Sequence, residues 1–326
     1  MIREVCLALV PAAIVYTYFF GWGVVFNVAI CISACVAFEA LALTLKQQAP
    51  LPVLADYSAC LTGLLLAFAL PTYLPIYVTL TACAFAILVA KQAYGGIGFN
   101  LFNPAMVGYC AVMVSFPIEM STWLPPFLGD IDYVRPAFTD QLLYVLTGDW
   151  PAPYTLDAVS QATPLDRVKS GLHASEIFIE IRTNPVFGDF GGRGWEWIGN
   201  FIALGGGYLL YRGLISWHIP VSVLAGVVIP ATLHSLLVSG AVPGAGFHVF
   251  SGATLLGAFF IATDPVSAAS HPRGRLVYGF GIGLIAWSIR TWGGYPDGIA
   301  FAVLLMNTAV PLIDRFSKPE GTAHAA

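Results

Sequence analysis

Residues 5–38 read VCLALVPAAIVYTYFFGWGVVFNVAICISACVAF and contain no charged side chain. A transmembrane helix needs about 20 apolar residues, so this stretch is long enough for two helices, which we expect to meet at Gly21-Trp22-Gly23. Pro11 falls inside the first helix, where a membrane helix tolerates it. The alternative is a cleaved signal peptide, but no small-residue cleavage site follows a single short apolar run. The stretch therefore predicts a membrane protein that begins with two spans.

The composition of the whole chain agrees with this prediction. Of the 326 residues, 58% are hydrophobic and 10% are charged, whereas a soluble domain carries roughly 25% charged residues. Apolar runs separated by turn signals predict an all-α polytopic membrane protein with about ten transmembrane helices. The expected spans are residues 5–20, 24–44, 56–71, 75–92, 100–117, 197–214, 218–238, 247–263, 275–291 and 297–313.

A long polar segment, residues 118–196, separates the fifth expected span from the sixth. It carries eleven acidic and five basic residues, so we expect it outside the bilayer. If the N-terminus is cytoplasmic, all short-loop cations except Arg290 fall on the cytoplasmic side, in keeping with the positive-inside rule. The cytoplasmic set is Arg3, Lys46, Lys91, Arg212, Arg273, Arg275, Arg315 and Lys318. The polar segment is then extracytoplasmic, and both termini are cytoplasmic.

The two ends of the chain resemble each other. Thr62–Pro71 is echoed by Thr254–Pro265, and Tyr94-Gly95-Gly96 by Trp292-Gly293-Gly294, while Asn103 has a counterpart in Asn307. A repeat of five helices has an odd number of spans, so its copies have opposite orientations. Lys91 and Arg290 then become counterparts on opposite faces. Inverted repeats with interrupted helices place a ligand or ion site near the midplane, although small residues also serve close helix packing.

These patterns divide the chain into four expected parts. They are a five-helix membrane repeat over residues 1–117, an extracytoplasmic segment over 118–196, a second five-helix repeat over 197–316, and a cytoplasmic tail over 317–326.

Neither the cysteines nor the histidines predict a metal site. Cys31 and Cys35 lie one helical turn apart, but no second close pair completes a site. His234 and His248 are separated by chain-breaking residues, and no second histidine pair exists to hold a haem. We expect no metal.

The polar segment contains Asp157-Ala158-Val159-Ser160-Gln161-Ala162-Thr163-Pro164-Leu165. Thr163 offers an acceptor hydroxyl, Ala162 leaves room for an approaching enzyme, and Pro164 disfavours helix at Thr163. Asp157 could orient or activate the hydroxyl. On these residues alone, a solvated loop in which Asp157 and Ser160 cap a turn is the simpler explanation.

A resemblance changes that balance. The motif resembles the one in which a flavin transferase attaches FMN, through its phosphate, to the last threonine. The blocks Gly95–Ala105 and Phe260–Ser267 resemble the family that comprises the B subunit of the sodium-pumping NADH:quinone reductase and the D subunit of the Rnf complex. The similarity covers essentially the whole chain. It implies covalent FMN on Thr163, with Asp157, Ser160 and Ala162 as the rest of the flavinylation motif.

Two features resemble the D subunit rather than the B subunit. Gln161 stands where the other subunit has glycine, and the first span begins near Val5 without a longer extension. A second threonine, in Ser251-Gly252-Ala253-Thr254, is a weaker acceptor candidate because His248 replaces the aspartate six residues before it. Thr254 also lies inside the eighth expected span, where no soluble transferase reaches.

The resemblance implies a flavin-carrying subunit of an ion-translocating complex in a bacterial inner membrane. That complex couples electron transfer between ferredoxin and NAD to Na⁺ or H⁺ movement, and the subunit is not expected to act alone. Its implied partners are other membrane and peripheral subunits, a flavin transferase and the lipid bilayer, with no nucleic acid. The chain has no dinucleotide-binding glycine motif and no ferredoxin-type cysteine run, so NAD and iron–sulfur clusters are expected on other subunits.

The resemblance also implies a second flavin, riboflavin or FMN, held without a covalent bond in the membrane part. Close packing explains the candidate blocks equally well. The candidate residues, which would serve either this flavin or an ion, are Gly95, Gly96, Asn100, Asn103, Thr263 and Asp264.

Three acids lie in or beside expected spans, where charges are costly and often functional. Asp56 and Asp264 could be ion stations or helix caps. Glu39 lies deeper, and either ion traffic or pairing with Lys46 or a neighbouring subunit would explain it. A secondary transporter without redox chemistry is the alternative function, since inverted repeats fit it equally well. Such a transporter has no need of an exposed acceptor threonine.

Overall fold

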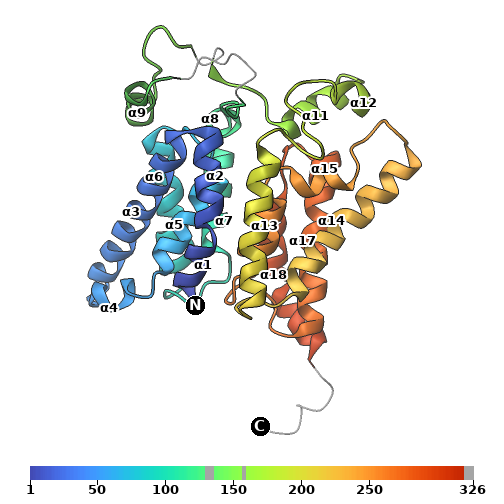
Figure 1. Ribbon diagram of the computed structural model, residues 1–326. Coiled ribbons are helices and arrows are strands. Elements are labelled where there is room, and N and C mark those ends of the chain that lie inside the picture. The colour runs from blue at the N-terminus through green and yellow to red at the C-terminus, as the bar shows by residue number, and fades with distance from the viewer. Residues whose placement is uncertain (129–135, 156–158, 319–326) are drawn as a thin grey trace.

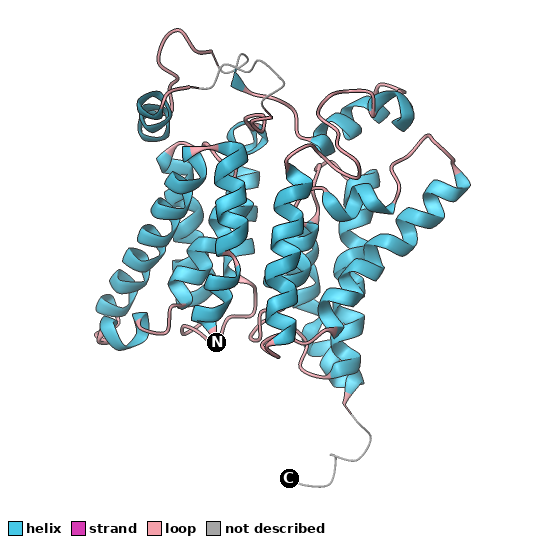
Figure 2. Ribbon diagram, in the orientation of Figure 1, coloured by secondary structure: helices cyan, strands magenta, loops and turns pink. Residues whose placement is uncertain are grey.

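The computed structural model describes residues 1–128, 136–155 and 159–318. Regular structure in these ranges is helical, apart from one isolated bridge between Phe187 and Gly192. Figures 1 and 2 show two groups of helices side by side, with short helices across one end. Helix is present at each of the ten apolar runs that the sequence predicts. The prediction of an all-helical fold is confirmed.

The first group of helices contains the charge-free stretch. Its elements are α1 (Ile2–Ala8), α2 (Val10–Phe20), α3 (Trp22–Leu45), α4 (Pro50–Leu54), α5 (Ser58–Ala69), α6 (Ile76–Ala84), the π-helix η1 (Phe85–Gln92), α7 (Pro104–Ser115) and α8 (Pro117–Ser121). The helix is interrupted at Leu9, between α1 and α2. Pro11 accounts for the interruption, because it has no N–H to donate and its ring crowds the carbonyl four residues earlier. Gly21 turns the chain into α3 with a φ of 77°, a conformation that glycine adopts without strain.

The second group of helices follows the polar segment. Its elements are α13 (Trp195–Tyr211), α14 (His218–Leu237), α15 (Ala245–Phe250), α16 (Thr254–Leu256), the π-helix η2 (Gly257–Ile261), α17 (Pro272–Trp292) and α18 (Ile299–Ser317). The eighth expected span is therefore interrupted at residues 251–253, where Gly252 has a φ of 61°. Backbone groups released at such a break need new partners inside the protein.

Between the two groups, the described part of the chain forms three short helices. They are α9 (Phe138–Thr147), α11 (Pro164–His173) and α12 (Phe178–Ile181). In Figure 1 they lie at the end of the molecule opposite the N-terminus and the last turns of α18.

Among the described residues, four stretches of helix are long and apolar enough to cross a membrane. They are Ile2–Phe20, Trp22–Leu45, His218–Leu237 and Ile299–Ser317, and shorter apolar helices span Ser58–Ala69, Ile76–Gln92 and Pro104–Ser115. Large apolar side chains remain exposed on these helices, as Leu237 does at 84%, which suits contact with lipid. The chain is a polytopic membrane protein.

The two asparagines that the repeat pattern pairs also meet in space. Asn103 caps α7, and its backbone N–H donates to Asn307 Oδ1 on α18 at 3.1 Å. The Asn103 side chain donates to the Ile261 carbonyl at 3.2 Å. Both side chains are buried. These bonds join the first group of helices to the second.

Candidate functional site

Thr163 is held at the start of α11. Its φ and ψ of −65° and 160° are extended, and Pro164 occupies the first helical position, where the missing N–H and fixed φ of proline are tolerated. The Thr163 hydroxyl accepts a hydrogen bond from the Asp166 backbone N–H at 3.2 Å, as an N-cap side chain does. It also donates to the Asp166 carboxylate. The acceptor hydroxyl therefore sits at a helix N-terminus, where the helix dipole favours a negatively charged group such as a phosphate.

The other residues of the predicted flavinylation motif are less fully described. Ser160 is half-buried, Ala162 is exposed, and Gln161 anchors the approach to Thr163 by donating its backbone N–H to the Trp123 carbonyl at 2.8 Å. Asp157 lies outside the described residues, so its role in the motif stays a prediction.

A cavity of about 310 Å³ opens beside Thr163, within the range of roughly 300–1,000 Å³ typical of small-molecule sites. Its walls come from both groups of helices and from the polar segment between them, and they are mainly apolar and aromatic. The aromatic part of the lining is Tyr16, Phe68, Tyr109, Trp123, Trp195, Phe250 and Tyr295. Thr163 and Asp166 line the same cavity, so the acceptor hydroxyl adjoins an aromatic space.

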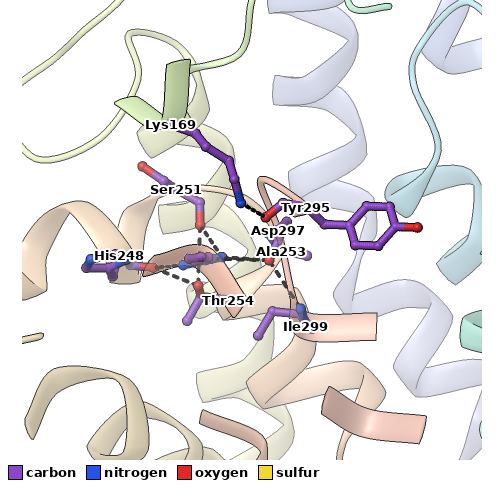
Figure 3. Close-up of polar contacts among 9 residues, drawn as sticks. Lys169, His248, Ser251, Ala253, Thr254, Tyr295, Asp297 and Ile299 are labelled. Atoms are coloured by element: carbon purple, nitrogen blue, oxygen red, sulfur yellow. Dashed lines mark hydrogen bonds and ion pairs between the residues drawn. The ribbon is translucent and has the colours of Figure 1, made fainter. Parts of the chain in front are cut away.

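A buried ion pair lies beside this cavity, and Figure 3 shows its Asp297 among the neighbouring polar contacts. Arg290 on α17 pairs with Asp297, which lines the cavity, at 3.0 Å, and the Arg290 side chain is 2% exposed. The same guanidinium donates to the carbonyls of His248 at 2.6 Å and Ser251 at 3.0 Å. Asp297 accepts from the Ala253 backbone N–H at 2.7 Å. Arg290 and Asp297 thus satisfy the backbone groups that the break between α15 and α16 releases.

Ser251 is the unused polar group of the cavity. It lines the cavity, its side chain is buried, and its Oγ has no hydrogen-bond partner among the described residues. An orphaned buried hydroxyl is costly unless something binds it. The Ser251 hydroxyl is therefore a buried polar group beside the cavity that the described residues leave unsatisfied.

Lys169 ties α11 to the loop between α17 and α18. Its ammonium donates to the carbonyl of Tyr295 at 2.7 Å and to that of Gly293, as Figure 3 shows for Tyr295. Burial lowers the pKa of the Lys169 ammonium, an effect that the negative charge of Asp166 opposes. Burial raises the pKa of the Asp166 carboxyl above its ordinary value, against the hydrogen bonds from Thr163 and the charge of Lys169.

The weaker acceptor candidate is enclosed. Thr254 is 0% exposed, and its hydroxyl donates to the carbonyl of His248 at 2.7 Å. A soluble enzyme has no access to this oxygen.

A second buried ion pair lies in the first group of helices. Glu39 on α3 pairs with Lys91 of η1 at 2.6 Å, with side chains 0% and 3% exposed, and accepts from Gln92 at 2.8 Å. Lys91 also donates to Ser58 Oγ at 2.6 Å. Lys46, one of the alternatives considered for Glu39, donates to Gln92 instead. The Lys46 alternative was wrong because η1 packs against α3 and places Lys91 beside Glu39. Lys91 and Arg290 were both expected in short loops. Both are instead buried side chains within helices, so neither counts as a loop cation.

The other two acids hold local backbone turns. Asp56 accepts from the backbone N–H and hydroxyl of Ser58 at the start of α5, which favours the helix-cap explanation for this residue. Asp264 accepts from the Val266 N–H and the Ser267 hydroxyl in the turn after η2, and no helix begins there, because α17 starts at Pro272.

The residues proposed for a second flavin lie in two adjoining blocks. Asn103 joins the blocks through the Ile261 carbonyl, Asn100 donates to the Phe102 carbonyl, and the Thr263 hydroxyl donates to Phe259. Gly95 and Gly96 have φ values of 116° and 104°. The polar side chains of this set are therefore already engaged in local bonds.

Metal-ligating side chains do not gather in the part of the chain that the structure describes. It contains no group of three or more His, Cys, Asp or Glu that could hold a metal ion. All six cysteines are free.

Sequence reasoning missed the roles of six residues in these clusters: Asp166, Lys169, Ser251, Arg290, Asp297 and Lys91. For Asp166 a signal exists, because Thr163-x-x-Asp166 is the spacing of an N-terminal helix cap. The others depend on contacts between segments far apart in the chain, which local patterns do not encode.

Comparison with known proteins extends over the whole chain. Residues 1–322 match the NQR2, RnfD, RnfE family. The chain is 46% identical to the D subunit of the ion-translocating oxidoreductase complex of Aliivibrio salmonicida (strain LFI1238), over 99% of this chain and 94% of that protein. It is 45% identical to the protein of the same name from Klebsiella pneumoniae (strain 342), over 98% of this chain and 93% of the relative.

Proposed function

The chain belongs to the NQR2, RnfD, RnfE family, and on that premise we propose that it is the flavin-carrying membrane subunit of an ion-translocating oxidoreductase complex. Relatives that are named as the D subunit of such a complex are 43–46% identical to it over nearly their full length. In this role the chain works with other membrane and peripheral subunits to couple electron transfer between ferredoxin and NAD to Na⁺ or H⁺ movement. It does not catalyse the overall reaction alone.

One observation carries the flavin assignment: the motif threonine adjoins a cavity with aromatic walls. Thr163 Oγ carries the FMN phosphate as a phosphoester, at the N-terminus of α11. The aromatic walls suit a planar isoalloxazine ring. These residues fit the group in shape and in chemistry.

A bound flavin supplies the electron transfer, and the protein supplies position and electrostatics. The aromatic walls exclude water from the ring. Arg290 and Asp297 fix the Ser251–Ala253 loop, so that the Ser251 hydroxyl stays at the cavity. Lys169 keeps the acceptor helix docked on the loop that bears Asp297.

A second flavin, riboflavin or FMN, belongs to the proposal on the strength of the family resemblance. The adjoining Gly95–Ala105 and Phe260–Ser267 blocks remain its candidate location, although their polar side chains have local partners. An ion site in the same blocks is the other candidate use of Asp264.

The proposed topology has ten spans in two inverted five-helix repeats, residues 1–117 and 197–316, with the flavin-bearing segment 118–196 extracytoplasmic. With Lys91 and Arg290 buried as ion-pair partners, seven short-loop cations remain of the nine in the sequence, and all seven fall on the proposed cytoplasmic side. The membrane is then a bacterial inner membrane, and a flavin transferase acts on the chain from outside the cytoplasm. Part of the tail 317–326 lies outside the described residues.

A secondary transporter without redox chemistry is the alternative. The buried Glu39–Lys91 pair would suit an ion path in either case. The cavity beside Thr163 distinguishes the two, because a transporter does not require an accessible acceptor threonine at a cavity wall.

Replacing Thr163 with alanine is expected to abolish covalent flavin. The wild-type chain, made in cells that contain a flavin transferase, gives a fluorescent band on a denaturing gel. Thr163→Ala gives a dark band at equal protein amount, and Thr254→Ala keeps its fluorescence because the Thr254 hydroxyl is buried. A dark wild-type band, or a fluorescent Thr163→Ala band, would contradict the assignment.

A further inference from the structure

The Thr163 hydroxyl has a carboxylate as its hydrogen-bond acceptor. It donates to Asp166 Oδ2 and accepts from the Asp166 backbone N–H at 3.2 Å. We infer that Asp166 takes up the proton of the Thr163 hydroxyl when that oxygen accepts the flavin phosphoryl group. The inference rests on the proposed function, since it assigns the base for flavin attachment to this chain rather than to the transferase alone.

The contact goes beyond that of a structural capping box. In a capping box the carboxylate at the third helical position accepts from the backbone N–H of the capping residue. Asp166 receives a backbone hydrogen bond of this kind from Thr163, and its carboxylate accepts from the Thr163 hydroxyl as well. Capping α11 requires only that Thr163 Oγ accept a bond. The bond from the hydroxyl to the carboxylate is therefore not needed for the helix.

The surroundings of Asp166 suit a base. Burial raises the pKa of its carboxyl, as does the charge of Asp297 across the cavity, while Lys169 on the same helix lowers it. Tyr109 of α7 lies within electrostatic reach, and the neighbouring Arg167 is occupied by Glu176 at 2.7 Å. Lys169 gives its own hydrogen bonds to the carbonyls of Gly293 and Tyr295. A carboxylate with a raised pKa holds a proton more strongly than an exposed one, which favours its uptake from an attacking hydroxyl.

The step balances as a phosphoryl transfer. Thr163 Oγ attacks the phosphorus of the FMN half of FAD, and a new O–P ester bond forms. The phosphoanhydride bond breaks, and AMP leaves with its electron pair. The hydroxyl proton passes to Asp166 Oδ2 and then to solvent. No oxidation or reduction occurs. The transferase contributes FAD and Mg²⁺ to this step. In other phosphoryl transfers the attacking hydroxyl likewise needs to be positioned and to have a base for its proton.

The test measures how fast the full-length, detergent-solubilised chain acquires flavin from FAD, Mg²⁺ and a purified flavin transferase, at a series of pH values. For the wild type we expect the initial rate to rise with pH through the raised pKa of Asp166, because only the ionised carboxylate accepts the proton. Asp166→Asn should lower the rate about 100-fold or more and remove this rise. Asp166→Glu should restore part of the rate together with the pH dependence.

Asp189→Asn is the matched control, because Asp189 is an exposed acid in the same polar segment. It should label at the wild-type rate. The melting temperatures of all variants report whether the fold is intact, and the slope of rate against pH reports the base even if Asp166→Asn is less stable. Wild-type labelling with an unchanged rate and pH profile in Asp166→Asn would overturn the inference and leave the proposed function standing. A wild-type chain that acquires no flavin on Thr163 would overturn the proposed function itself.

Discussion

Replacing Lys91 with methionine is expected to lower the free energy of unfolding by about 3–5 kcal/mol, the cost of leaving one charge of a buried pair without its partner. Glu39 is 0% exposed, and Lys91 contacts its two carboxylate oxygens at 2.6 and 2.9 Å. Among the described side chains, Gln92 alone would remain as a donor to that carboxylate. The measurement is chemical unfolding of the purified chain in mixed micelles.

Two controls separate the ion pair from a general loss of lysine. Lys318→Met makes the same chemical change at an exposed position and should change stability by no more than about 0.5 kcal/mol. Lys91→Met combined with Glu39→Gln removes both charges and should recover most of the loss, because replacing a whole buried pair is often neutral. If the single Lys91 variant unfolds like the wild type, the pair does not stabilise the first group of helices.

Replacing Arg290 with methionine is expected to lower the free energy of unfolding by a similar amount, about 3–5 kcal/mol, and to loosen the wall of the cavity beside Thr163. Asp297 would lose its charged partner, and the carbonyls of His248 and Ser251 would lose their donor. Arg290→Lys keeps the charge but cannot reproduce the planar set of donors. Its stability should therefore lie between that of the wild type and that of Arg290→Met. The measurements are unfolding in mixed micelles and the accessibility of a cysteine placed at Ala253.

The matched control is Arg212→Met. Arg212 pairs with Glu4 at 3.1 Å, but the two side chains are 47% and 32% exposed, and exposed pairs contribute about 0–1 kcal/mol. Asp297→Asn added to Arg290→Met removes the unpaired charge while keeping an acceptor for Ala253, and should recover part of the loss. Equal losses in the Arg212 and Arg290 variants would mean that burial does not govern the effect.

The helices were the predictable part of the fold. Apolar runs and turn residues predicted the position of helix at each expected span. This works because each segment in lipid must satisfy its own backbone hydrogen bonds, whatever the other segments do. The expected runs 218–238 and 275–291 agree closely with α14 and α17. That all ten runs cross the membrane, with opposite orientations in the two repeats, stays a prediction.

The interruption of the eighth span shows what local patterns leave out. Residues 251–253 could leave helical geometry because Arg290 and Asp297 bind the freed backbone, and both come from a segment about forty residues away in the chain. Lys91 looked like a loop cation at the end of an apolar run, but the packing of η1 on α3 makes it the partner of Glu39. Contacts of this kind depend on how helices meet.

For the proposed acceptor site, the sequence predicts a candidate residue but not its surroundings. The motif and its family resemblance singled out Thr163, and Pro164 agreed with an extended conformation there. The cavity beside it draws its walls from both groups of helices, so no single stretch of sequence could reveal it.

The central claim is that Thr163 carries FMN, and the mass of one peptide tests it most directly. Cleavage on the amino side of aspartate releases residues 157–165, which contain Ser160 and Thr163 as the only hydroxyl side chains. In chain purified from cells with a flavin transferase, we expect this peptide to be heavier by one esterified FMN, with fragment ions that locate the addition on Thr163. An unmodified peptide, or an addition on Ser160, would contradict the claim.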